Sequence, residues 1–241
     1  MKYLLFLSLL VLSFQNSVLA QAQSSDDSTD YNKLYKSVMD EYGFDQVLVN
    51  GIYYEDKYGK KRGHEFFQED RLYTGNLSYR GKEYKGIEMK YDICNQQLIL
   101  YLKYNDKTVS VVPPNDFISA FNLGDKIFTK DDSQGKPEFF QVIFDAEKLK
   151  CLYYWSKQIH KTSDGGNSSS YYYEFTDDEK KNYLKINGLY ENYRDNRSFT
   201  ELFPHEIKAL VRQYIKTNHI KIVKSSDEKI REVLTYCNSL L

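Results

Sequence analysis

No charge of one sign predominates in this sequence, where 33 Lys and Arg residues stand against 34 Asp and Glu residues. Positive and negative side chains alternate along most of the chain instead of forming blocks. Nucleic-acid binding needs a basic stripe, and attachment to an anionic membrane needs a polybasic patch. The composition therefore argues against nucleic acid as a partner and against a polybasic membrane patch.

Cysteine is scarce, and its spacing excludes a dense set of cross-links. Cys94, Cys151 and Cys237 lie far apart, each beside apolar residues. This pattern fits neither a disulfide framework nor the spacing of metal ligands. We interpret the three side chains as buried small hydrophobic groups, with one disulfide among them as the alternative. We expect no metal and no cofactor.

Catalytic signatures are also missing. The sequence has no Gly-x-Ser-x-Gly elbow, no His-Glu-x-x-His pair and no glycine-rich phosphate loop. Its four histidines do not cluster. Glu69 and Asp70, the first acid pair to consider, would point to opposite faces of a strand. No catalytic residue can be assigned, so the sequence favours a protein that is not an enzyme.

The only long apolar run lies at the N-terminus. Residues 1–20 join a positive second residue, an apolar stretch and a Val18-x-Ala20 exit, which is typical of a cleaved signal peptide. The run is shorter than the roughly 20 apolar residues that span a bilayer, and we predict no transmembrane segment in the mature chain. We expect a periplasmic or extracellular protein of a Gram-negative bacterium, with a disordered polar leader at residues 21–29.

The spacing of apolar residues changes along the rest of the chain. Residues 30–42 repeat at helical spacing, and from residue 47 to about 193 the repeat becomes two, in short runs separated by turn formers. Strands joined by such short turns pair antiparallel with their sequence neighbours. We expect a single α+β domain at residues 30–241. It would hold about ten mostly antiparallel strands in a bent sheet, sandwich or open barrel, with one N-terminal and two C-terminal helices from about residue 199.

Helix signals return near the C-terminus. Pro204 suits the first turn of one helix. Ser225 with Glu228 predicts a capping box at the start of the next. The link at residues 219–223 is expected to be extended.

The stretch at residues 64–92 raises the question of whether it is a binding site or only part of the sheet. From residue 87 to 93 apolar and polar residues alternate, which predicts one buried face and a wet face that carries Asp92. Gly75, Gly81 and Gly86 suit turns or tight bends. The pattern favours a structural role for this stretch.

Aromatic clusters are the remaining indication of a binding function. The chain has 23 Tyr and 14 Phe, and consecutive rings in a strand point to opposite faces. Rings on an outer face can stack on sugars or form a protein interface, or they can be cross-strand pairs that stiffen the sheet. The candidate binding residues are Phe66, Tyr73, Tyr153, Trp155 and Tyr172.

One block of motifs resembles a known group of sequences. It consists of Gly-His-x-Phe-Phe at 63–67, Asn-Leu-Ser-Tyr-Arg-Gly-Lys-x-Tyr at 76–84, Ile-x-Met-Lys-Tyr-Asp-Ile at 87–93 and Leu-Ile-Leu at 98–100. The block is similar to a family of uncharacterised exported β-rich proteins from Gram-negative bacteria, whose function is unknown. The resemblance implies a signal peptide, a core of strands and turns and a helical end, and it supplies no catalytic residues.

These observations converge on a function hypothesis. The sequence favours an exported, non-catalytic binding or interaction protein of the cell envelope. Its partner would be an envelope protein, a glycan or a lipid. The alternative is a hydrolase of glycan or peptide whose two carboxylates lie far apart in the sequence.

Overall fold

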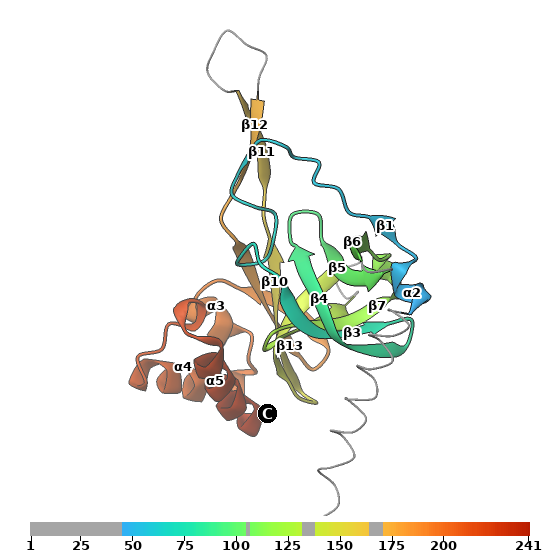
Figure 1. The fold of residues 1–241 in the computed structure, drawn as a ribbon. Coiled ribbons are helices and arrows are strands. Elements are labelled where there is room, and N and C mark those ends of the chain that lie inside the picture. The colour runs from blue at the N-terminus through green and yellow to red at the C-terminus, as the bar shows by residue number, and fades with distance from the viewer. Residues whose placement is uncertain (1–44, 105–106, 132–137, 164–170) are drawn as a thin grey trace, which may run out of the picture. The chain divides into compact units, whose positions relative to one another are not determined.

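The fold consists mainly of β-strands followed by helices at the C-terminus (Figure 1). The computed structural model describes residues 45–104, 107–131, 138–163 and 171–241. Residues 46–241 belong to one unit. The predicted signal peptide, leader and first helix fall outside the described residues.

The described residues contain fourteen strands and several helices. The strands are β1 (Ile52–Tyr53), β2 (Lys61–Arg62), β3 (Tyr73–Tyr79), β4 (Lys82–Asp92), β5 (Gln97–Tyr104), β6 (Lys107–Val112), β7 (Ile118–Leu123), β8 (Lys126–Asp131), β9 (Glu138–Asp145), β10 (Leu149–Ser156), β11 (Ile159–Ser163), β12 (Tyr171–Phe175), β13 (Glu179–Ile186) and β14 (Leu189–Tyr193). The helices are α2 (Gln46–Val49), η1 (Asn115–Phe117), α3 (Asn196–Glu201), α4 (His205–Thr217), η2 (Ile222–Lys224) and α5 (Asp227–Leu240). The mostly antiparallel α+β class is confirmed. There are more strands than the ten expected, partly because two-residue pairings such as β1 and β2 leave no periodic signal.

Eleven strands form one sheet in the order β1-β6-β5-β4-β3-β7-β8-β9-β10-β13-β14, and β11-β12-β2 form a second. The pairs of the large sheet are antiparallel. Most strands pair with a sequence neighbour, as their short turns require. The pairs β1–β6, β3–β7 and β10–β13 are the exceptions, and they join segments that are distant in the sequence.

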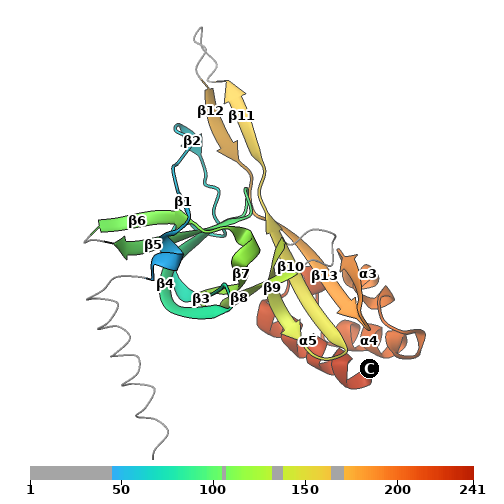
Figure 2. The ribbon, with the colours of Figure 1, turned by 90° about the vertical axis from the view of Figure 1, so that its right-hand side faces the viewer.

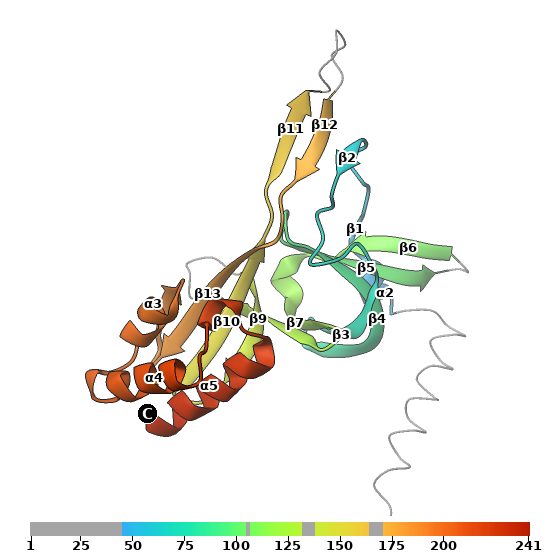
Figure 3. The same ribbon diagram turned by 90° about the vertical axis from the view of Figure 1, so that its left-hand side faces the viewer.

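The large sheet is open and strongly bent, as Figures 2 and 3 show for β3 to β8. The Tyr91 ring on β4 lies 6.1 Å from the Phe139 ring on β9. Four strand spacings separate β4 from β9, which is about 19 Å in a flat sheet. The sheet therefore curls, and its concave side is filled by rings. Those rings are Phe67, Tyr91, Phe121, Phe128 and Phe139.

Two glycines permit this bend. Gly86 has a φ of 67° and lies where two β4 residues oppose one residue of β3, which is a β-bulge. Gly75 needs no left-handed backbone, but a Cβ at this position would overlap the carbonyl oxygen of Asn122 on β7. The predicted tight bend is confirmed for Gly86, whereas the prediction is wrong for Gly75, which lies within β3 and is needed for the close approach of two strands.

The C-terminal helices cover one face of β9, β10 and β13 (Figures 1 and 3). Their core is largely aliphatic and combines sheet residues such as Leu149 and Leu184 with Val211, Val233 and Leu234 from α4 and α5. Amphipathic helices bury such a stripe against a sheet. None of the described helices is both long and apolar enough to cross a membrane.

The helix boundaries differ in detail from the sequence expectation. The N-cap of α5 is Ser226, whose Oγ accepts from the Lys229 backbone N–H, and not Ser225. The link expected to be extended contains the 3-10 turn η2, in which Asn196 binds the Ile222 N–H. A further short helix, α3, begins with a capping box between Asp195 and Ser198.

The second sheet contains the hairpin predicted around residues 162–170, whose tip lies outside the described residues. Its strands β11 and β12 pair antiparallel from Ser163 and Tyr171 onward. The third strand, β2, pairs with β12 in parallel. Turn signals predict only antiparallel pairs of neighbouring strands, so they did not predict this parallel pair.

The three cysteines are unpaired, as free thiols. Cys151 and Cys237 are buried in the helix-covered core, and burial raises the pKa of each thiol to about 12. Cys94 is half-buried, and burial raises its pKa too. Thiols with raised pKa values are weak nucleophiles. The interpretation as buried hydrophobic groups fits Cys151 and Cys237, and the disulfide alternative is wrong for this structure.

Candidate functional site

Residues 64–68, here called the strap, run alongside the end of β4. The Phe67 N–H donates to the Tyr91 carbonyl at 2.9 Å, and the Ile93 N–H donates to the Glu65 carbonyl at 3.0 Å. The strap takes this place because β3 begins only at Tyr73, opposite Met89, and leaves the last residues of β4 without a strand partner on the edge away from β5. The strap thus supplies hydrogen bonds that would otherwise be missing.

A buried lysine at the end of β10 fixes the strap. The Lys157 ammonium donates to the carbonyls of His64 at 2.9 Å and Phe66 at 3.0 Å, and it pairs with Asp178 at 3.0 Å. The other oxygen of Asp178 accepts from the Gln68 N–H at 2.9 Å. Burial and the nearby Lys157 charge lower the pKa of His64. These contacts give Lys157 and His64 a structural role.

Two carboxylates are buried here, that of Glu65 in the strap and that of Asp92 at the end of β4. Glu65 accepts from the Tyr54 hydroxyl at 2.7 Å and pairs with Lys61 at 3.1 Å. Asp92 accepts from the backbone and side-chain N–H groups of Asn95 at 2.8 and 2.7 Å. Burial raises the pKa of Asp92 despite these bonds. Burial also raises the pKa of the Tyr54 hydroxyl, and its hydrogen bond to Glu65 raises it further.

The sequence pattern predicted that Asp92 lies on the solvent-exposed face of the strand. This prediction is wrong, because only 1 % of the residue is exposed. The alternation predicted for residues 87–91 is present, with Ile87, Met89 and Tyr91 buried. At Asp92 the strap and the following turn cover the second face of the strand. A local pattern cannot report such a distant segment.

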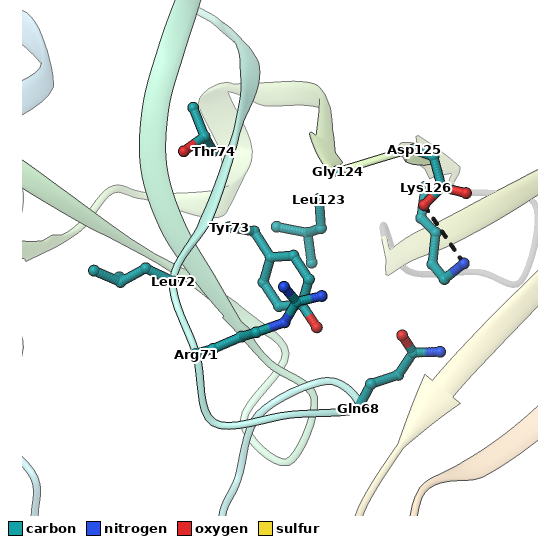
Figure 4. Close-up of a pocket in the computed structure, with 9 residues that line it drawn as sticks. All are labelled: Gln68, Arg71, Leu72, Tyr73, Thr74, Leu123, Gly124, Asp125 and Lys126. Carbon is teal, nitrogen blue, oxygen red and sulfur yellow. Dashed lines mark ion pairs between the residues drawn. The ribbon is translucent and has the colours of Figure 1, made fainter.

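Next to the strap lies a hollow of about 390 Å³, shown in Figure 4. It is lined by Gln68, Arg71, Leu72, Tyr73, Thr74, Leu123, Gly124, Asp125 and Lys126. One wall is the loop between the strap and β3, and the other is the turn between β7 and β8. Gln68 has a φ of 55°, which is uncommon for a residue other than glycine and is more frequent at functional positions.

Tyr73 supplies the most informative group of the hollow. Only 8 % of Tyr73 is exposed, and its hydroxyl is buried without a hydrogen-bond partner among the described residues. The guanidinium of Arg71 lies 4.3 Å from the centre of the Tyr73 ring. The interaction of Arg71 with the Tyr73 hydroxyl raises the pKa of Arg71, although the two groups do not meet the distance and angle requirements of a hydrogen bond. Buried polar atoms are normally satisfied, so this one calls for an explanation.

Two further hollows lie on the helical side of the unit. One, of about 700 Å³, is formed by α3, the end of α4 and the residues before η2, and its rim carries Arg197, Lys216 and Lys221. Basic residues near the end of a helix are common because they complement its dipole. The other is a shallow space beside β14 and Pro204. None of the buried unpartnered side-chain atoms among the described residues belongs to either lining.

The five aromatic candidates do not form one surface. Phe66, Tyr73, Tyr153 and Tyr172 are buried, and Trp155 is partly buried. Tyr153 belongs to the core beneath the helices, and Tyr172 lies under Arg62 in the second sheet. Buried rings cannot stack on an external sugar, so the geometry on which this prediction depended is missing. A binding role for these residues stays a prediction, and Tyr73 alone lines the hollow.

The acid pair and metal ligands considered from the sequence are not assembled into a site. Glu69 pairs with Arg71, and Asp70 pairs with Lys90. Among the described residues, no three His, Cys, Asp or Glu side chains are grouped so that they could hold a metal ion.

Sequence reasoning missed Arg71, Lys126 and Gln68. The Gly124-Asp125 pair is a recognisable turn signal between two strands. Nothing in the sequence, however, places that turn beside residues 68–72. The β3–β7 pairing does so, and it joins strands that are not sequence neighbours.

Known proteins give no further guide to this site. Comparison of the chain with family models, with curated proteins and with solved structures finds no match.

Proposed function

We propose that this chain is an exported, non-catalytic binding protein of the cell envelope that holds a small ligand in the hollow beside Tyr73. The observation that supports this most directly is the buried hydroxyl of Tyr73, which has no partner and lines the hollow. A ligand that supplied a hydrogen bond there would remove a cost of about 1 to 3 kcal/mol for an unsatisfied buried group.

The chemistry of the hollow supports binding over hydrolysis. Glycosidases need two carboxyl groups that flank the substrate. The hollow has one carboxylate in its lining, that of Asp125. The two buried carboxylates, Glu65 and Asp92, are outside that lining and are occupied by hydrogen bonds from Tyr54 and Asn95. The hydrolase alternative therefore gains no support from the residues around the hollow.

Export is proposed from the N-terminal sequence pattern. Mass spectrometry of the protein recovered from an envelope fraction should find an N-terminus at Gln21 or, if cleavage follows Ala22 in the alternative Ala20-x-Ala22 exit, at Gln23. Recovery of the chain with Met1 in place would contradict export by a cleaved signal peptide.

The binding proposal is tested by a thermal-shift screen of the purified protein against sugars, sugar acids, peptidoglycan fragments, amino acids and fatty acids. A ligand at about 100 times its dissociation constant stabilises the folded state by roughly 2.7 kcal/mol. The melting temperature should then rise by a few degrees. Each ligand found is repeated with Tyr73→Phe, which keeps the ring and removes only the hydroxyl, and its shift should shrink.

Tyr79→Phe is the matched control for this variant. The Tyr79 hydroxyl is also buried without a partner among the described residues, but Tyr79 does not line the hollow. Removing it should leave ligand shifts unchanged. Equal losses in both variants would show that binding occurs elsewhere, and a screen without any shift would overturn the small-ligand proposal.

A further inference from the structure

The charges around the hollow indicate which kind of ligand it would hold. Two cations, Arg71 and Lys126, and one carboxylate, Asp125, line it. The lining itself carries one net positive charge, which the Glu69 carboxylate outside the lining balances until a ligand takes its place. A singly charged anion neutralises such a lining, whereas a phosphate monoester carries a charge of about −1.5 to −2 and leaves an excess of negative charge.

Both cations are held by partners that a ligand can displace. Arg71 pairs with Glu69 at 2.8 Å and Lys126 with Asp125 at 3.7 Å, and the two carboxylate side chains are 66 % and 82 % exposed. Exposed ion pairs contribute only about 0 to 1 kcal/mol because water screens them. A ligand carboxylate can therefore take their place at little cost.

The position of Arg71 favours a planar carboxylate. Its stacking on the Tyr73 ring restrains the guanidinium beside the unpartnered Tyr73 hydroxyl. Figure 4 shows these two groups between Gln68 and Leu123, with the turn of Asp125 and Lys126 at the far side. A guanidinium offers two parallel N–H groups to a carboxylate, which gives both strength and orientation.

The remaining groups favour a ligand that also carries hydroxyls. The Tyr73 hydroxyl can donate and accept, and the Gln68 amide offers both functions. The volume of about 390 Å³ is at the small end of the range of roughly 300 to 1,000 Å³ for ligand sites. We infer that the hollow binds a small hydroxylated monocarboxylate of the size of a sugar acid, with its carboxylate between Arg71 and Lys126. This inference rests on the proposed binding function.

Titration calorimetry with four probes tests the inference: glucuronate, glucose, glucose 6-phosphate and acetate. Glucuronate should bind most tightly, and glucose, which lacks the carboxylate, about tenfold more weakly. Acetate should bind weakly because it has no hydroxyl for Tyr73 or Gln68. Added salt should weaken glucuronate binding, since the attraction is partly between exposed charges.

Three variants locate the binding. Arg71→Gln should weaken glucuronate binding about tenfold and leave the affinity for glucose nearly unchanged, because only the charged contact is lost. Tyr73→Phe should weaken both. The matched control is Arg62→Gln, since Arg62 also stacks on a tyrosine, 4.6 Å from the Tyr172 ring centre, and lies outside the hollow.

The possible outcomes separate the inference from the proposed function. Equal affinity for glucose and glucuronate, or tighter binding of glucose 6-phosphate, would overturn the monocarboxylate and leave a binding protein. The monocarboxylate is also overturned, and the binding protein remains, if none of the four probes binds while another compound gives a thermal shift that depends on Tyr73. If neither the probes nor the wider screen bind, both proposals fall.

Discussion

The curled strands and the helix-covered strands use different side chains for the same task. Inside the curl, rings from strands far apart in the sheet meet edge to face, as Tyr91 and Phe139 do. Beneath the helices the core is mainly Ile, Val and Leu. A curled sheet must fill the space between its own strands, and long flat rings reach across it. A helix fills the space over a flatter sheet, so short branched side chains suffice.

The two cores meet at β9 and β10. Trp155 packs against the helix-covered core, and its ring lies 5.1 Å from that of Phe67 on the strap. Its indole N–H donates to Gln141 at 2.8 Å, and Gln141 donates to Asp227 on α5 at 3.0 Å. This chain of contacts predicts that the two regions unfold together.

The largest effect is expected from Phe128→Ala, which tests the curled core. The Phe128 ring stacks on Phe121 and contacts Phe67 and Tyr91. Its removal should lower the free energy of unfolding by about 4 kcal/mol, measured by urea denaturation.

The counterpart in the other core is Leu234→Ala on α5, a fully buried residue, with an expected loss of about 3 kcal/mol. Both variants should retain a single unfolding transition that circular dichroism and Trp155 fluorescence report alike. Two separate transitions would show that the regions are independent domains.

The next largest effect is expected from Lys157→Met, which removes the ammonium that fixes the strap. Asp178 then loses its ion pair, and the carbonyls of His64 and Phe66 lose their hydrogen bonds to the ammonium. We expect a loss of about 3 kcal/mol in unfolding free energy, and faster hydrogen exchange in the strap. The control, Lys103→Met, changes an exposed lysine on β5 and should have an effect of less than about 0.5 kcal/mol. Equal effects would show that the strap is held mainly by its β4 pairing.

Gly75→Ala tests the close approach of β3 and β7, on which the wall of the hollow depends. The added methyl group would overlap the Asn122 carbonyl, so we expect a loss of about 2 kcal/mol. Gly59→Ala is the comparison, because an added methyl group at Gly59 meets no atom within 4 Å. Its only cost is that of an alanine with a φ of 56°, about 1 kcal/mol. A smaller loss at Gly75 than at Gly59 would contradict the steric argument.

The smallest effect is a dependence on pH at Asp92. Its folded-state pKa is raised above the ordinary value of 3.8, so its protonated form favours folding. This contribution is complete below pH 3.8 and is lost as the pH rises through the folded-state value. The stability of the wild type relative to Asp92→Asn, from urea denaturation, should therefore fall as the pH rises above 3.8. A rise in this relative stability with pH would contradict the burial argument.

Local patterns in the sequence predict much of the fold and little of the site. Alternation along β4 and helical spacing in α4 and α5 are properties of neighbouring residues, so antiparallel strands and C-terminal helices were predictable. The hollow depends on Gln68 and Lys126 meeting across the β3–β7 pair, and the burial of Asp92 depends on the strap. Such long-range pairings are decided by the whole sheet, which one sequence does not specify.

The parallel pairing of β2 with β12 has a consequence for the order in which the chain folds. Lys61 lies opposite Tyr173, so β2 gains its partner only after most of the large sheet has been synthesised. Pairings between distant segments form late, because the chain between them loses much entropy on closure. We expect the strap and the hollow to be among the last parts to form, so that refolding assays would detect sheet formation before ligand binding.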